Sequence, residues 1–198
     1  IELRLTEIGK TFPQISAIYI YGSSLRSRRS NDLDILVVID LQQTNTHTLR
    51  EIRDILAETI DETLDINFVT EYELKNRVHV DRPVSYYIGI KLASKLVYGK
   101  DILSIVQINE LTREDVKKRI MALTQRARHA YLNNKETDFW HKKLVKWAKT
   151  CILELLYLEG TFELDYNKGI EKYIANQPEK RSYILALLTE TLTLEEIW

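Results

Sequence analysis

Three aspartates in the first half of the chain have the residue type and spacing of a metal site. Asp32 and Asp34 lie two residues apart at the start of an apolar segment, and Asp65 lies in a second segment of this kind. Residues two apart on a strand project from the same face, so the first two carboxylates can share a cation. Close carboxylates repel each other unless a cation neutralises them, and oxygen ligands favour Mg²⁺ or Mn²⁺ over zinc. The sequence therefore predicts a site for Mg²⁺ or Mn²⁺.

A Gly-Ser turn precedes these aspartates. Gly22 and Ser23 follow a segment rich in Ile and Tyr, and Ser24 and Arg26 lie in the same loop. A residue without Cβ lets the backbone approach a phosphate and directs free N–H groups at it. We therefore expect a phosphate-binding turn here, in which Arg26 could pair with phosphate oxygens, with a solvated loop as the alternative for the arginine.

The elements that must position these residues form a mixed α/β region. The patterns predict helices over residues 2 to 11 and 47 to 60, and strands over residues 15 to 21, 33 to 39 and 64 to 69. In the last strand Ile66 and Phe68 alternate with Asp65 and Asn67, which predicts one apolar face and one polar face. If the strands of Asp34 and Asp65 are neighbours, the three carboxylates can form one cluster.

Amphipathic helical patterns dominate after residue 82, and no further convincing strand is evident. We expect helices over residues 116 to 131, 140 to 158, 167 to 176 and 179 to 190. The predicted fold class is therefore α+β. A small mixed-sheet core spans residues 1 to 82, and an α-helical bundle spans residues 83 to 198.

The order of these motifs resembles a known family. A strand, Gly22-Ser23, a short linker, an Asp-apolar-Asp-apolar motif at Asp32 and Asp34, and the later strand residue Asp65 are similar to the nucleotidyltransferases of the DNA polymerase β superfamily, which include the minimal and the aminoglycoside enzymes. The similarity covers residues 15 to 70, and residues 93 to 101 are similar to a segment that often follows this core.

This resemblance implies both a nucleotidyltransferase core in residues 1 to 82 and an activity. Gly22 and Ser23 would bind the nucleotide phosphates, Asp32 and Asp34 would bind the metal ions, and Asp65 would be the third carboxylate. The implied reaction transfers a nucleoside monophosphate from a nucleoside triphosphate to a hydroxyl acceptor, which could belong to a small molecule, a protein or an RNA end.

Two alternatives concern function and partners. The linker over residues 24 to 31 is shorter than usual in the family, which favours a catalytically weak binding module such as an antitoxin or scaffold, whereas the three aspartates favour an enzyme. The basic helices over residues 116 to 149 could bind a protein or RNA partner or could be a solvated face. Glu110, Glu114 and Asp115 could instead supply an acidic pocket for a cationic antibiotic. A homodimer is one of the assembly states left open.

The amino-acid composition limits the possible functions and the cellular location of the protein. The chain has 28 Lys and Arg against 29 Asp and Glu, so its formal charge of -1 does not favour a template-directed polymerase or a membrane surface. No apolar stretch is long enough to span a bilayer. The single Cys151 lies in an apolar helical pattern, which is typical of a reduced compartment, and we therefore expect a cytoplasmic protein.

Overall fold

The structure is a computed structural model of the chain. It describes residues 1–25, 33–40, 42, 44–60, 63–76, 84–107, 112–133, 137–163 and 165–189. The chain divides into two compact units, Ile1–Asn109 and Glu110–Trp198.

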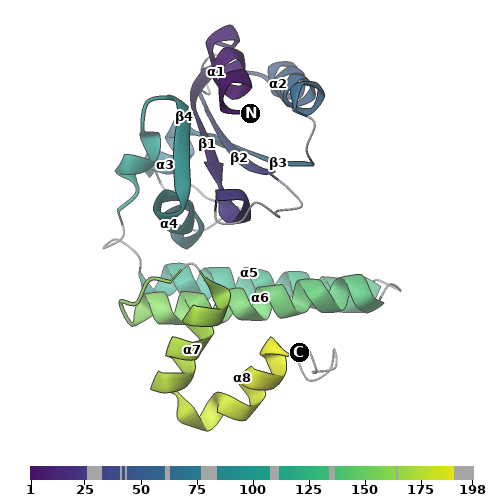
Figure 1. Ribbon diagram of the computed structural model, residues 1–198, viewed down its shortest axis with the longest axis vertical. Helices are drawn as coiled ribbons and strands as arrows, with labels where there is room; N and C mark the ends of the chain where they lie inside the picture. Colours follow the sequence, from purple (N-terminus) through teal and green to yellow (C-terminus); the bar gives the residue numbers. More distant parts are fainter. Residues whose placement is uncertain are drawn as a thin grey trace. The chain divides into compact units, whose positions relative to one another are not determined.

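The first unit is built on a four-stranded sheet with the strand order β3-β2-β1-β4 (Figure 1). The strands are β1 (Ile15–Tyr21), β2 (Leu33–Ile39), β3 (Leu64–Thr70) and β4 (Ser94–Gly99). β1 pairs antiparallel with both β2 and β4, whereas β2 and β3 run parallel. The sheet is therefore mixed, as the sequence predicts, and β2 lies between the two strands that carry Tyr21 and Asp65.

Two helices bury one face of this sheet. They are α1 (Glu2–Thr11) and α2 (Thr46–Thr59), which match the predicted helices within one residue at each end. α2 begins where the Asn45 side chain accepts a hydrogen bond from the Thr48 backbone N–H at 3.0 Å, a common helix start. The apolar cluster that joins both helices to the sheet includes Leu5, Ile8, Ile18, Ile20, Ile35, Val37, Ile52 and Leu56. This packing leaves the other face of the sheet for polar residues at the ends of the strands.

The opposite face contacts α4 (Val84–Leu92) and the short helical turn η3 (Ile102–Ile105). The hydroxyl of Tyr19 accepts a hydrogen bond from the Leu103 backbone N–H at 3.1 Å and lies 3.1 Å from an Asp101 carboxylate oxygen. Burial raises the pKa of Tyr19 to about 12, so the phenol stays protonated and can donate to Asp101. A further helix, α3 (Glu71–Asn76), follows β3 directly.

The strand β4 corrects the expectation that no strand follows residue 82. It is an edge strand that pairs with β1 on one side only, and its residues are exposed or half-buried. Edge strands need no regular alternation of apolar and polar residues, so the pattern gave little signal. The compact division accordingly falls between residues 109 and 110 and not between residues 82 and 83, because α4 and β4 pack with the sheet.

The second unit is helical, as predicted. Its helices are α5 (Arg113–Asn133), α6 (Thr137–Leu158), α7 (Tyr166–Asn176) and α8 (Arg181–Leu188), and the turn η5 (Pro178–Lys180) precedes the last of them. Its core includes Leu153, Leu156 and Ile170. A buried ion pair joins α5 to α6, where Arg119 Nε lies 2.9 Å from Glu154 Oε1. Within the described part of the chain, no helix has the length and apolar character to cross a bilayer.

The anchor at Tyr19 leads to a stability prediction. Replacing Tyr19 by Phe keeps the ring but leaves the Leu103 N–H without its acceptor, so we expect the free energy of unfolding to fall by about 1–2 kcal/mol. Chemical denaturation followed by circular dichroism measures the change. Tyr72→Phe is the matched control because the Tyr72 side chain is 58% exposed. Equal losses in the two variants would contradict the assignment of Tyr19 as an anchor.

Candidate active site

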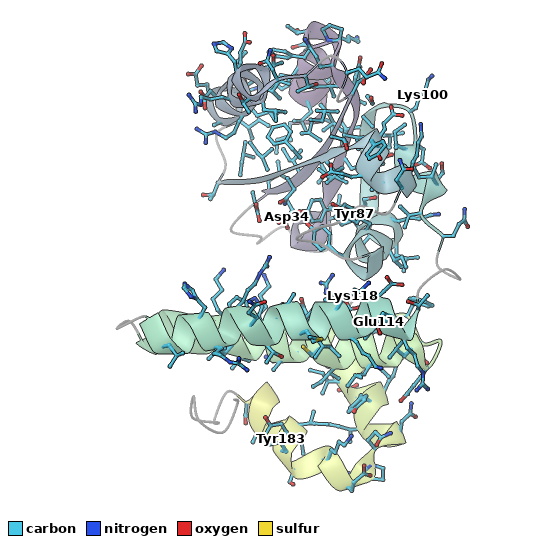
Figure 2. The ribbon with its side chains drawn as sticks, turned by 180° about the vertical axis from the view of Figure 1, so that it is seen from behind. Asp34, Tyr87, Lys100, Glu114, Lys118 and Tyr183 are labelled. Carbon is cyan, nitrogen blue, oxygen red and sulfur yellow. The ribbon has the colours of Figure 1, made fainter. Side chains whose placement is uncertain are left out.

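The candidate site is a row of register-paired residues across three neighbouring strands, which we call the rung. Tyr21 on β1 is the register partner of Asp34 on β2, and Asp34 is the register partner of Asp65 on β3. Register partners on neighbouring strands point to the same face, and neighbouring strands lie about 4.7–4.9 Å apart. The carboxylates of Asp34 and Asp65 are therefore neighbours on the face opposite α1 and α2. Asp34 is labelled among the side chains of the first unit in Figure 2. Asp34 is half-buried and Asp65 is exposed.

Gly22 lies against the Asp34 carboxylate. It follows the end of β1, starts the short turn η1 (Gly22–Leu25) and has a φ of 83°, which is in the left-handed region. A Cβ atom at Gly22 would lie 2.2 Å from Asp34 Oδ2. The absence of a side chain at this position therefore makes room for the carboxylate. Sequence reasoning singled out Gly22 for phosphate approach and missed this second reason for a glycine.

The Tyr21 hydroxyl lies in the electrostatic field of both aspartates. Burial is the largest cause that raises the pKa of Tyr21, and the neighbouring Tyr86 and then the charges of Asp34 and Asp65 raise it further. The phenol consequently stays protonated at any physiological pH. The influence of both carboxylates on one hydroxyl agrees with the register, which brings these three side chains together.

Asn67 connects this hydroxyl to Asp65. It lies two residues beyond Asp65 on the same face of β3 and is buried. Its Nδ2 lies 2.5 Å from the Tyr21 hydroxyl and 3.5 Å from Asp65 Oδ1, and the Tyr21 hydroxyl lies 2.9 Å from that of Tyr86 on α4. The alternation predicted for β3 is confirmed, because Ile66 and Phe68 pack against the apolar cluster on the other face. That alternation placed Asn67 on the polar face but gave it no role, and nothing in the sequence pointed to Tyr86.

Two of the predicted site residues, Asp32 and Arg26, lie outside the part of the chain that the structure describes. The backbones of Ser23 and Ser24 belong to η1, whereas their side chains lie outside the described part. The structure thus brings together Gly22, Asp34 and Asp65.

The contacts of the acidic residues predicted for an antibiotic pocket do not point to a binding site. Asp115 Oδ2 accepts hydrogen bonds from the backbone N–H of Thr112 at 2.9 Å and from its hydroxyl, which is the role of a helix cap at the start of α5. Glu114 is exposed, and Glu110 lies outside the described residues. The observed contacts of Asp115 are therefore structural.

The donor set at the rung fits a hard divalent cation. Asp34 and Asp65 offer carboxylate oxygens only, which are the ligands that Mg²⁺ and Mn²⁺ prefer. Among the described residues, no group of three or more His, Cys, Asp or Glu side chains could hold a metal ion. Two of the three predicted carboxylates are neighbours, and the third, Asp32, is not among the described residues.

Comparison with known proteins identifies the fold. No known family profile and no curated protein matches the chain. Among solved structures, spectinomycin adenyltransferase AAD(9) from Enterococcus faecialis, crystallised with ATP and spectinomycin, matches with a TM-score of 0.55 and 15% identity over 95% of this chain and 86% of that chain.

Two further structures match less closely. A toxin-antitoxin complex with AMP-PNP has a TM-score of 0.38 and 14% identity over 66% of this chain and 90% of that chain. A mutant of the toxin-antitoxin MntA-HpeT has a TM-score of 0.34 and 13% identity over 66% of this chain and 90% of that chain. The adenyltransferase alone informs the fold: this chain has the nucleotidyltransferase fold that its Gly-Ser turn and strand aspartates predict.

Proposed function

We propose that the chain transfers a nucleoside monophosphate from a nucleoside triphosphate to a hydroxyl acceptor with the help of Mg²⁺. The observation that carries this proposal is the pair of carboxylates at Asp34 and Asp65, side by side on one rung and next to the turn at Gly22. Like charges directly opposite each other destabilise a sheet. A bound cation that neutralises both carboxylates is the simplest explanation for their presence at paired positions. The fold shared with an adenyltransferase supports the same reaction class.

The residues take separate roles in this proposal. Asp34 and Asp65, with Asp32, would hold the metal ions, which when bound neutralise the phosphate charge and orient the α-phosphate. The acceptor oxygen forms a bond to the α-phosphorus while the bond between the α-phosphorus and the α–β bridging oxygen breaks. The electron pair of the broken bond leaves on that oxygen with pyrophosphate. Asp65 is the exposed carboxylate of the pair and accepts the proton of the acceptor hydroxyl.

The turn after β1 would bind the phosphates. We propose that the backbone at Gly22 and Ser23 approaches the triphosphate, and that Ser24 and Arg26 contribute polar and positive groups. ATP is the nucleotide that we propose first, because the adenyltransferase of the same fold was crystallised with ATP.

The charge of the α5–α6 region favours an anionic acceptor, such as an RNA end or an acidic protein, over a cationic antibiotic. Residues 113 to 149 contain 11 Lys and Arg against 4 Asp and Glu, whereas the whole chain has a formal charge of -1. The basic side chains that are exposed and have no ion pair among the described residues are Arg113, Lys117, Lys118, Arg126, Lys142 and Lys146. Such a surface attracts phosphate and carboxylate groups over several ångströms.

The first prediction of this proposal concerns metal-dependent nucleotide binding. We expect ATP to bind in the presence of Mg²⁺ but not in the presence of EDTA, and Asp34→Asn to weaken that binding by at least tenfold, or about 1.4 kcal/mol. Calorimetric titration of ATP, GTP, CTP and UTP measures the affinity and the base preference. Asp54→Asn is the matched control, because Asp54 lies half exposed on α2 and pairs with Arg53 on the surface. Absence of binding to all four nucleotides would favour a binding module such as an antitoxin or scaffold.

A second prediction tests the contact between Gly22 and Asp34. Gly22→Ala places a methyl group 2.2 Å from the present position of Asp34 Oδ2, so the carboxylate must move. We expect Mg²⁺-dependent ATP binding to weaken by at least tenfold. Gly160→Ala is the control. Gly160 has a φ of 78°, and no atom lies within 4 Å of the added methyl group. This variant therefore has the same backbone strain as Gly22→Ala but no steric clash. Equal ATP affinities in the two variants would refute the role given to Gly22.

A third prediction concerns the acceptor. We expect ATP labelled at the α-phosphate to label RNA or acidic protein, and Lys142→Gln/Lys146→Gln to reduce this labelling about tenfold while ATP affinity is retained, because several weakened contacts to an anion add up. The control variant Lys10→Gln/Lys168→Gln removes two other exposed lysines. Labelling of a cationic aminocyclitol, undiminished in the Lys142 and Lys146 variant, would contradict the anionic acceptor.

A further inference from the structure

We propose that Asn67 is a positioning residue, which holds the Asp65 carboxylate toward Asp34 and is itself held by the hydroxyls of Tyr21 and Tyr86. This inference rests on the proposed function, because it assigns a task to Asn67 within the same metal site. It adds three side chains to the site that neither the motif nor the fold indicates.

Both amide hydrogens of Asn67 have an acceptor. Nδ2 lies 2.5 Å from the Tyr21 hydroxyl oxygen and 3.5 Å from Asp65 Oδ1. An ionised carboxylate accepts hydrogen bonds only, so the amide must turn its nitrogen toward Asp65. The contact to Asp65 is long, and it has room to shorten when a cation draws the carboxylate inward. The amide thus favours one orientation of a carboxylate that is otherwise exposed.

Tyr21 supplies the fixed end of this chain of hydrogen bonds. Its ring is 8% exposed, and it extends from β1 across β2 to reach Asn67 on β3. Its hydroxyl lies 2.9 Å from the hydroxyl of Tyr86, and the two rings meet edge to face with centroids 6.5 Å apart. Tyr86 in turn packs edge to face on Tyr87, with centroids 5.3 Å apart. The Asn67 amide is therefore tied to α4 as well as to the sheet.

The two aspartates need different support, which is the reason for this arrangement. Asp34 is half-buried, and its carboxylate is confined by the backbone at Gly22. Asp65 is exposed and is repelled by the charge of Asp34, so an unsupported side chain would rotate away into solvent. A purely structural pair would be served about as well by Leu and Phe at these two positions, because replacing both partners of a buried hydrogen bond by apolar groups of similar shape can be nearly neutral. Side chains that orient metal ligands from behind commonly change metal affinity by 10–100-fold.

The experiment is a titration of the nucleotide-free protein with Mn²⁺, followed by the electron paramagnetic resonance signal of free Mn²⁺. The variants are Asp34→Asn, Asp65→Asn, Asn67→Leu, Tyr21→Phe and Tyr86→Phe, with Tyr72→Phe as the control on the exposed α3 surface. We expect Asn67→Leu to weaken Mn²⁺ binding about tenfold. Tyr21→Phe keeps the ring and removes the acceptor of Asn67, so it should weaken binding in the same direction by a smaller factor. Tyr86→Phe should have the smallest effect, and Tyr72→Phe none.

The outcomes separate this inference from the proposed function. If the wild-type protein binds no Mn²⁺ that depends on Asp34 and Asp65, the proposed function fails and the inference fails with it. If binding depends on both aspartates but Asn67→Leu retains it within about twofold, less than the usual effect of such side chains, the inference alone is overturned. If circular dichroism finds Asn67→Leu unfolded, Tyr21→Phe decides, and an unchanged affinity in that variant overturns the inference.

Discussion

Asp34 and Asp65 face the same side of neighbouring parallel strands, and their mutual repulsion must be balanced for the sheet to keep this register. The register itself is set by the apolar face, where the alternate residues Leu33, Ile35 and Val37 pack into the cluster with α1 and α2. A slip of one residue would expose that apolar set and bury the charges. The hydrophobic core therefore fixes the position of the two carboxylates, and the proposed cation would offset the repulsion between them.

The surroundings of the rung restrain its side chains by different means. Gly22 lets the backbone close on the Asp34 carboxylate, whereas the Asn67 amide lies within hydrogen-bond distance of Asp65 and donates to the Tyr21 hydroxyl. A backbone wall and a hydrogen-bond chain both lower the number of orientations that a charged side chain can adopt before the ligand arrives. Such preorganisation matters because every ångström of misplacement reduces the benefit of a fixed charge. The anchor at Tyr86 means that the position of α4 contributes to the geometry on the sheet.

The sequence predicts those features of the site that are encoded within a single segment, and it misses those that depend on contacts between segments. The apolar runs of β1 and β2, the alternation in β3 and the helical periodicity of α2 each lie within one segment, and all four elements are found where they are expected. β4 was missed because an edge strand that is largely exposed carries no regular pattern. The contact of Tyr21 with Asn67 joins β1 to β3 across an intervening strand, so no spacing rule could reveal it. The same holds for Tyr86, whose partner lies on a different element.

We propose above all that Asp34 and Asp65 together bind one or more divalent cations. Anomalous diffraction from crystals grown with Mn²⁺ and AMP-PNP tests it most directly, because the signal locates the ion independently of the protein coordinates. We expect an anomalous peak within direct coordination distance of both carboxylates, beside the turn that begins at Gly22. A peak elsewhere in the chain, or two carboxylates turned away from each other with no ion between them, would contradict it.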